Sequence, residues 1–331
     1  LGGAVLALSM FGLFAVTPPV APLAWFAITI TGLFSAFSFL SINFYAQGVS
    51  KSQAIRGGHV RLGAWREGGA LLGVCIAAVA PTLLMGYSEA PFAIFAIGFA
   101  AVVVLAVLAM GPEWTGSMRA EPTGIRQILS DTLARRLLIL ALVNATPLAV
   151  SSTLFLFFVE SRLEAPGWEG PLLVLFFLAG AATAPLWSRA AERYGPKPVL
   201  FFAMVSAIIS FGFAFLLGPG DAMFFAIICV ASGATIGADL VLMPALFSAR
   251  MAAISPNGGQ GFGLWSLVQK FTLAFAAIVL LPLLDASGFE AGSAIQPPEA
   301  LALLTILYAL VPCGLKLLAI AILARTDLTK I

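Results

Sequence analysis

The sequence is poor in charge. Charged residues make up 10% of its 331 residues and hydrophobic residues 61%, whereas an average soluble domain is about 25% charged. So few charges cannot cover the surface of a water-soluble protein of this length. These few charges can instead lie at the ends of helices whose sides face lipid. The net charge is only +2, and no dense run of lysine and arginine occurs, so we expect no nucleic-acid partner.

Histidine and cysteine are also scarce. His59 is the single histidine, which excludes most histidine-based catalytic and metal sites. Cys75, Cys229 and Cys313 lie far apart within apolar stretches and suggest neither a disulfide framework nor a metal site. The nucleotide-binding and hydrolase motifs GxxxxGK[ST], HExxH and GxSxG are absent. We therefore expect no enzyme, no metal and no cofactor.

Long apolar runs dominate what is present. A helix needs about 20 apolar residues to cross a bilayer, and continuously apolar runs favour helices over an alternating β-barrel. Ten segments reach or approach that length, and the first of them begins the sequence. The predicted fold is therefore an all-α membrane protein with ten spans at 2–17, 24–45, 69–86, 91–111, 137–159, 171–188, 198–217, 223–247, 263–284 and 300–324.

The basic residues indicate an orientation. Successive loops lie on alternate sides of the membrane and so form two sets. Of the 17 lysines and arginines, Lys270 and Lys316 lie within spans and Arg162 lies in a loop of the first set. The loops of the other set and the tail carry the remaining 14, and positively charged loops remain in the cytoplasm. Both ends of the chain are therefore expected in the cytoplasm, with these residues: Lys51, Arg56, Arg61, Arg66, Arg119, Arg126, Arg135, Arg136, Arg189, Arg193, Lys197, Arg250, Arg325 and Lys330.

A charged loop divides the chain unequally. Residues 112–136 form the longest charged segment between spans, with four spans before it and six after it. A transporter of six plus six spans would look like this without its first two spans. We therefore interpret 1–111 as the remainder of an N-terminal half, 112–136 as a central cytoplasmic loop and 137–331 as a C-terminal half. The alternative is a protein complete with ten spans.

Several motifs carry a family resemblance. The loop after the sixth span is similar to the cytoplasmic signature loop of the major facilitator superfamily. Three further segments resemble the glycoside–pentoside–hexuronide:cation symporters, the melibiose permease group. These four segments are Trp187-Ser-Arg189-Ala-Ala-Glu192-Arg193-Tyr-Gly195-Pro-Lys197, then Ser41-Ile-Asn43-Phe-Tyr45-Ala with Arg61-Leu-Gly-Ala-Trp65-Arg66-Glu67, then Gly237-Ala-Asp239-Leu-Val-Leu-Met-Pro244, and Gly261-Phe-Gly-Leu-Trp265-Ser-Leu-Val-Gln269-Lys270-Phe-Thr272.

The resemblance implies a helical bundle of twelve spans, of which ten are present, and symport of a sugar, glycoside or related polar solute with a proton or sodium ion. Two positions depart from the family pattern. Ser41 stands near a position that is often acidic, and Ser248-Ala249 replaces a common Ala-Asp pair. The resemblance also implies a bacterial inner membrane as location, and a monomer is expected for this fold.

Charges inside spans are candidates for function because each costs about 2.5–3.5 kcal/mol at the bilayer centre. Asp239 and Lys270 lie at matching depths in consecutive antiparallel spans, so we predict that they pair and line the cavity. The resemblance also places Lys270 near the cation and sugar sites. The alternatives are a static ion pair and a lysine that reaches the inner surface. We expect Lys316, in the last span, to reach the inner surface in this way.

The resemblance makes Arg66 a sugar contact and Tyr45 an aromatic platform for the sugar ring, with Asn43 adding a polar group nearby. A guanidinium suits paired hydroxyls or a carboxylate. The alternatives are a basic anchor at the membrane surface for Arg66 and an interfacial aromatic belt for Tyr45.

Weaker site candidates are Asn144, in the first span of the C-terminal half, and Trp265 and Gln269 beside Lys270. The same span carries the hydroxyls of Ser151, Ser152 and Thr153. The alternative to a site role for these is a hydrogen bond to a backbone carbonyl of their own helix. An inner gate is expected at Arg189, Glu192, Arg193, Gly195 and Lys197. Two Gly-xxx-Gly pairs, Gly69 with Gly73 and Gly233 with Gly237, predict close approach of helices.

Two other functions remain open from the sequence. The scarcity of charge within the spans permits a lipid-like or amphipathic cargo. A membrane scaffold or assembly factor that transports nothing is the third possibility.

Overall fold

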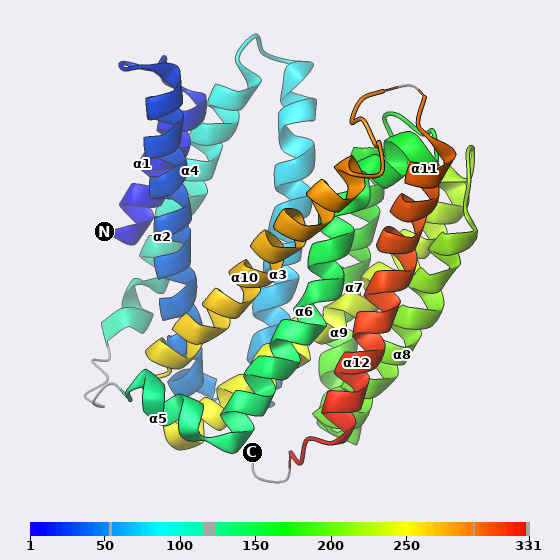
Figure 1. The fold of residues 1–331 in the computed structure, drawn as a ribbon. Coiled ribbons are helices and arrows are strands. Elements are labelled where there is room, and N and C mark those ends of the chain that lie inside the picture. The colour runs from blue at the N-terminus through cyan, green and yellow to red at the C-terminus, as the bar shows by residue number, and fades with distance from the viewer. Residues whose placement is uncertain (53–54, 116–122, 294, 329–331) are drawn as a thin grey trace.

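The computed structural model describes residues 1–331 except 53–54, 116–122, 294 and 329–331. Arg119 and Lys330, assigned above to the basic loops, and part of the 112–136 loop lie outside the described residues. The elements of the chain are helical (Figure 1): α1 (Gly2–Phe14), α2 (Pro22–Lys51), α3 (Gly58–Met85), α4 (Pro91–Met110), η2 (Gly111–Thr115), α5 (Ile125–Ser130), α6 (Thr132–Phe157), η3 (Phe158–Arg162), α7 (Glu169–Tyr194), α8 (Pro196–Gly212), η4 (Phe213–Leu216), α9 (Ala222–Ile254), α10 (Gly259–Asp285), α11 (Pro298–Thr305), η5 (Ile306–Leu310) and α12 (Val311–Ala324).

The expected all-α membrane fold is confirmed. In the described part of the chain, nine helical segments are long and apolar enough to cross a membrane, and α1 is a shorter apolar helix. Each predicted span coincides with one of these ten segments. The helices extend beyond the apolar cores: α3 begins at Gly58 and not at 69, and α9 continues to Ile254 and not to 247. Arg61, Arg66 and Glu67 are therefore helical residues and not loop residues.

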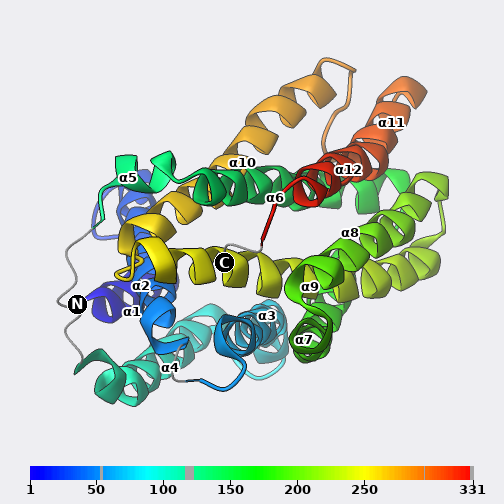
Figure 2. The same cartoon turned by 90° about the horizontal axis from the view of Figure 1, so that it is seen from below.

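The helices form two groups. We call α1 to α4 the N-terminal part and α6 to α12 the C-terminal part. Within the N-terminal part, α1 packs on α2 and α4, and α3 packs on α4. The two parts meet where α3 packs on α7 and α9, and where α2 packs on α9 and α10. Figure 2 shows α3 between α4 and α7.

The connections at the two ends of the bundle differ in charge. The described parts of the basic loops lie at the bottom of Figure 1, together with α5 and the end of α12; we call this the basic end. The opposite end carries Glu89, Asp221, Asp285 and Glu290, and we call it the acidic end. This alternation of charge agrees with the nine longer segments each running from one end to the other, whereas α1, with 13 residues, begins partway along the bundle (Figure 1).

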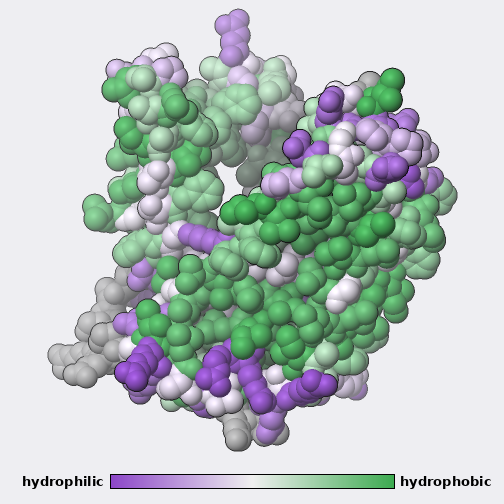
Figure 3. Space-filling model, in the orientation of Figure 1, coloured by the Kyte–Doolittle hydropathy of each residue, from purple (hydrophilic) through white to green (hydrophobic). Residues whose placement is uncertain are grey.

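The two parts are joined near the basic end. The rings of Tyr45 and Phe262 lie 5.0 Å apart across the boundary, and a hydrogen bond of 2.8 Å joins His59 to Ser248. Toward the acidic end, α2 and the C-terminal part separate, and the surface is hollowed between them (Figure 3). The molecule is therefore closed at the basic end and open at the acidic end.

The C-terminal part is held together by close helix contacts. A Cβ atom added to Gly233 of α9 would lie 2.2 Å from the Phe176 carbonyl oxygen of α7, and one added to Gly237 would lie 2.8 Å from the Gly180 carbonyl oxygen. The Trp187 indole donates to the Ala234 carbonyl across the same contact, at 2.7 Å. The predicted close approach at Gly233 and Gly237 is confirmed.

The other Gly-xxx-Gly pair behaves differently. No atom lies within 4 Å of a Cβ built on Gly69 or Gly73. The prediction of a close approach there was wrong, because these glycines do not face a neighbouring helix.

Candidate functional site

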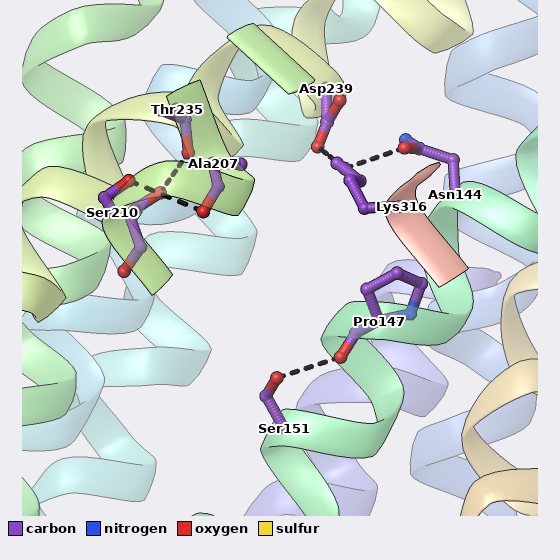
Figure 4. A network of polar contacts seen from close by, with 9 residues as sticks. Asn144, Pro147, Ser151, Ala207, Ser210, Thr235, Asp239 and Lys316 are labelled. Carbon is purple, nitrogen blue, oxygen red and sulfur yellow. Dashed lines mark hydrogen bonds and ion pairs between the residues drawn. The ribbon is translucent and has the colours of Figure 1, made fainter. Parts of the chain in front are cut away.

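A buried ion pair lies in the middle of the C-terminal part (Figure 4). Asp239 of α9 accepts a hydrogen bond from the Lys316 ammonium of α12. The ammonium also donates to Asn144 Oδ1 of α6 at 2.7 Å. All three residues are buried. Three helices that are far apart in sequence therefore share one polar contact inside an apolar bundle.

The ion pair lies deep in the membrane. Asp239 precedes the last residue of α9 by 15 positions, which is about 22 Å at 1.5 Å per residue. A buried charge pair gains little net stability, because taking the charges out of water costs as much as their attraction returns. Removing one partner leaves an unpaired buried charge, so these three side chains constrain one another strongly.

The predicted pairing of Asp239 with Lys270 was wrong. Lys270 donates to the Ser38 hydroxyl of α2, and its side chain is exposed. The predicted behaviour of Lys316 was also wrong: Lys316 is 6% exposed and does not reach the surface. The depth of Asp239 and Lys270 was compatible with a pair, but Asp239 is turned toward α12 rather than α10.

The contact of Lys270 has another significance. Ser38 belongs to the N-terminal part and Lys270 to the C-terminal part, so their hydrogen bond crosses the boundary between the two. Of the two lysines that the sequence placed within spans, Lys270 is exposed and Lys316 is buried.

A second polar cluster occupies the facing helices α2 and α3. The Tyr45 hydroxyl donates to Glu67 Oε1 at 2.6 Å, and Arg66 Nε donates to the same oxygen at 2.7 Å. The Arg66 guanidinium also lies 3.6 Å from the centre of the Tyr45 ring, a cation–π contact. Glu67 is therefore paired within its own cluster. We call these three residues the Arg66 cluster.

The Arg66 cluster touches the C-terminal part through aromatic rings. Tyr45 contacts Phe262, and Phe262 and Trp265 both pack on Phe247, at 5.4 and 5.1 Å between ring centres. Trp265 is buried in this stack. Its position at the boundary is compatible with the predicted site but shows packing, not a free binding surface.

The single histidine bridges both parts at the basic end. His59 of α3 lies 2.8 Å from the Ser248 hydroxyl of α9 and 3.2 Å from the Ser52 hydroxyl at the end of α2. Ser248 occupies one of the two positions that depart from the family pattern. Its hydroxyl meets the imidazole of His59.

The expected gate residues lie at the basic end. Gly195 has φ +87 and forms the turn between α7 and α8. The Lys197 ammonium donates to the carbonyls of Ala324 and Thr326 at the end of α12, at 3.1 and 2.6 Å. The Arg193 guanidinium lies 5.2 Å from the Tyr194 ring centre.

The other two gate residues approach α3. A Cβ built on Gly57, just before α3, would lie 2.6 Å from Glu192 Oε1. Arg189 and Glu192 line a cavity of about 530 Å³ together with Arg61 and Trp65 of α3. These gate residues therefore lie on the boundary between the two parts.

Another ion pair closes the basic end of the C-terminal part. Arg250 of α9 donates to Asp131, with Nε to Oδ1 at 3.0 Å, and Asp131 accepts from the Ala134 amide at 2.7 Å as the N-cap of α6. The hydrogen bonds from Arg250 lower the pKa of the Asp131 carboxyl, and the Ala134 amide contributes in the same direction.

Two expected site residues are not brought to a cluster. The Asn43 side chain donates to the Phe39 carbonyl of its own helix at 2.7 Å. The Gln269 side chain is exposed beside Lys270. Ser151 and Thr153 bond to their own helix, at the carbonyls of Pro147 and Ala149, which is the alternative stated for them.

A cavity of about 120 Å³ adjoins the buried ion pair within the C-terminal part. Asn144, Asp239 and Lys316 line one end, and Phe155, Phe176, Phe177, Phe211 and Tyr308 line its walls. Sequence reasoning missed both this cavity and the role of Lys316. The available signal was the depth of Asn144, Asp239 and Lys316 near the middle of their spans.

The membrane helices, the closure at one end and the hollow at the other define a membrane transport protein rather than an enzyme. Residues 1–330 match the family described as MFS/sugar transport protein. The chain belongs to this family of major facilitator superfamily transporters. No curated protein matches it in a sequence comparison.

Solved structures agree on the fold. A bacterial homologue of the iron transporter ferroportin in an outward-facing state has a TM-score of 0.67 at 13% identity, covering 98% of this chain and 81% of that chain. The E. coli fucose:proton symporter has a TM-score of 0.63 at 15% identity, covering 96% and 82%. The human organic anion transporter MFSD10 (TETRAN) has a TM-score of 0.62 at 19% identity, covering 97% and 75%.

Proposed function

We propose that the protein is a secondary active transporter that carries a sugar, glycoside or related small polar solute by alternating access, in symport with a proton or sodium ion. The observation that carries the proposal is the arrangement of the two parts. They meet at the basic end and leave a hollow toward the acidic end. Binding between two halves that rock about a central site is the mechanism of this type of fold.

The orientation follows from the positive-inside rule. The basic end faces the cytoplasm, so the hollow opens outward and the end of α12 lies inside. The protein resides in the inner membrane of a bacterium, as the family resemblance implies, and acts as a monomer. To face inward it must break the contacts at the basic end, which include His59 with Ser248 and Tyr45 with Phe262.

The side chains at the boundary suit a hydroxylated solute. Lys270 places an exposed ammonium at the boundary, and the Arg66 cluster places a guanidinium and a carboxylate beside the closed contact of Tyr45 with Phe262. Such donors and acceptors pair with sugar hydroxyls, and the Tyr45 ring offers an apolar face when Arg66 moves from it. The known fucose:proton symporter has the same fold.

A second candidate cargo is amphipathic. The aromatic walls of the cavity in the C-terminal part favour it, because such walls exclude a solute that carries hydroxyls on every side.

Uptake by the protein in proteoliposomes tests the proposal. Radiolabelled sugars are offered with a proton gradient, with a sodium gradient and with neither. We expect accumulation that depends on one gradient and is lost in Lys270→Ala. Arg325→Ala, which removes an exposed charge at the end of α12, is the matched control and should transport normally. If folded protein accumulates no sugar under any gradient, the sugar symport proposal fails and an amphipathic cargo or a scaffold role replaces it.

A further inference from the structure

The cavity of the C-terminal part ends in an unpaired acceptor. Asp239 Oδ2 accepts from Lys316. Asp239 Oδ1 is buried and has no hydrogen-bond partner among the described residues. Asp239 is 6% exposed and lines the cavity. A buried carboxylate oxygen without a donor is costly, so this atom requires a donor from whatever fills the cavity.

The charges around this atom restrict the donor. The Lys316 ammonium already contacts the carboxylate, so a second cation would be repelled by it. An anion would meet the carboxylate oxygen itself. The donor is therefore a neutral group, of which a hydroxyl is the simplest.

The walls of the cavity restrict the rest of the molecule. Phenylalanine side chains from α6, α7 and α8 and the Tyr308 ring from η5 surround it. Apart from the ion pair, Asn144 and Ser152, the hydroxyls of the lining already donate to backbone carbonyls: Ser151 to Pro147, Ser232 to Ile228 and Thr235 to Ser232. A ligand with polar groups on every side would leave most of them unpaired here.

The volume sets the size. The cavity of about 120 Å³ is close to that of a known engineered apolar cavity of about 150 Å³ in another protein, which binds benzene. A single ring or a short branched chain fits, whereas a disaccharide or a phospholipid does not.

The walls also contain an unusual backbone feature. Two π-helical turns, η3 and η5, face one another, with the Phe158 and Tyr308 rings stacked at 4.1 Å. Single π-turns are frequent at functional sites. Here Tyr308 of η5 lines the cavity, and η5 directly precedes α12, the helix that carries Lys316.

We propose that this cavity is a binding site for a small neutral amphiphile, a single-ring or short-chain molecule with one hydroxyl that donates to Asp239 Oδ1. The site lies within one part of the molecule, apart from the boundary at which the transported solute is expected. It therefore goes beyond the proposed sugar symport, and binding there is testable without transport.

Cysteine labelling of the protein in proteoliposomes tests the site. Cys313, which is half-buried, lines the cavity, as does the buried Cys229, whereas Cys75 on α3 is buried outside the cavity. The probes are benzyl alcohol and toluene, which differ by one hydroxyl. We measure by mass spectrometry how each slows the modification of the Cys313 and Cys75 thiols by N-ethylmaleimide. We expect benzyl alcohol to protect Cys313 saturably and to leave Cys75 unaffected.

The hydroxyl should contribute clearly to affinity. A hydrogen bond to a charged group is worth about 1.5–3 kcal/mol, so benzyl alcohol should protect at about tenfold to a hundredfold lower concentration than toluene. The double variant Asp239→Leu/Lys316→Met removes both charges together, which buried pairs tolerate. It should abolish the preference for the alcohol while toluene still protects.

A second variant keeps the test decisive if the double variant does not fold. Ala207→Phe fills the cavity from α8 and should remove protection of Cys313 by both probes. Equal protection of Cys75 and Cys313 would show a general bilayer effect and overturn the proposal. So would the absence of saturable protection, which would show that the cavity holds only water.

Discussion

Two helices of this protein, α4 and α9, show how little hydropathy says about burial. The most apolar stretch of α4 has a mean hydropathy of 2.9, yet 6% of it is buried. The corresponding stretch of α9 has a mean hydropathy of 2.0 and is 67% buried. The more polar helix is the interior one, because small residues let α9 approach its neighbours and its polar groups find partners there.

The difference extends to the two parts of the molecule. Helices of the N-terminal part expose most of their apolar surface, as lipid permits. The C-terminal part packs around the Asp239–Lys316 pair. Substitutions in the C-terminal part should therefore act on stability, while those along the boundary should act on the closure of the basic end.

The largest effect is expected from Lys316→Met. It leaves the Asp239 carboxylate buried without its partner, which costs about 3–5 kcal/mol. Denaturant unfolding in detergent micelles measures the loss. Lys270→Met removes an exposed lysine and should change stability by about 0.5 kcal/mol or less. Similar losses in both variants would contradict the assignment of Lys316 to the interior.

Gly233→Ala should have the next largest effect. The added methyl would lie 2.2 Å from the Phe176 carbonyl oxygen, so α7 and α9 must separate at a cost of about 1–3 kcal/mol. Gly98→Ala is the control in α4, where no atom lies within 4 Å of the new Cβ, and it should not destabilise. The comparison between the two helices fails if both substitutions are equally tolerated in thermal unfolding.

Gly63→Val should loosen the boundary rather than a helix bundle. A Cβ at Gly63 would lie 3.1 Å from the Val241 carbonyl oxygen of α9, so a larger side chain pushes α3 from the C-terminal part. A cysteine placed at buried position Ser52 should then react severalfold faster with a maleimide. Gly69→Val, in open space on the same helix, should leave the rate unchanged. Equal rates in all three proteins would show that the contact does not hold the closure.

The smallest effect is expected from Asp131→Asn. Asparagine keeps the N-cap but loses the charge paired with Arg250, and a partly exposed pair is worth about 0.2–1 kcal/mol. Because the pKa of Asp131 is lowered in the fold, this contribution is complete above the unfolded value of about 3.9 and is lost as the pH falls through the lowered pKa. The free energies of unfolding of variant and parent protein should differ at pH 7 and should differ less at pH 2 to 3. A constant difference would assign the effect to the cap.

Hydropathy and loop charge predicted the number and direction of the helices, because a span must be apolar and its ends must be polar. The ends were predicted less well. Polar residues such as Arg66 and Glu67 lie inside α3, since each of them satisfies the other within the helix. An apolar run therefore measures the hydrocarbon thickness and not the full length of the helix.

The sequence identified two of the three residues of the buried ion-pair site but not the contacts between them. Asp239 was chosen from its charge and depth and Asn144 from its place in the first span of the C-terminal half, and the structure brings them together. Lys316 was assigned to the surface, although depth alone would have placed it with them. Depth follows from counting residues along a span. Which neighbour a side chain meets depends on the rotation of the helix about its axis, which ten nearly uniform apolar segments leave undefined.

The sequence by itself determined that this protein crosses a membrane repeatedly, which end of the bundle is basic, and that no common catalytic motif is present. The reason is that transfer from water to lipid acts on each segment separately. The tertiary structure decided which lysine meets Asp239, which glycine pair allows close packing, and where the cavity and the hollow lie. These depend on contacts between segments far apart in the chain, and lipid, unlike water, imposes no preference that would mark the buried face of a helix in advance.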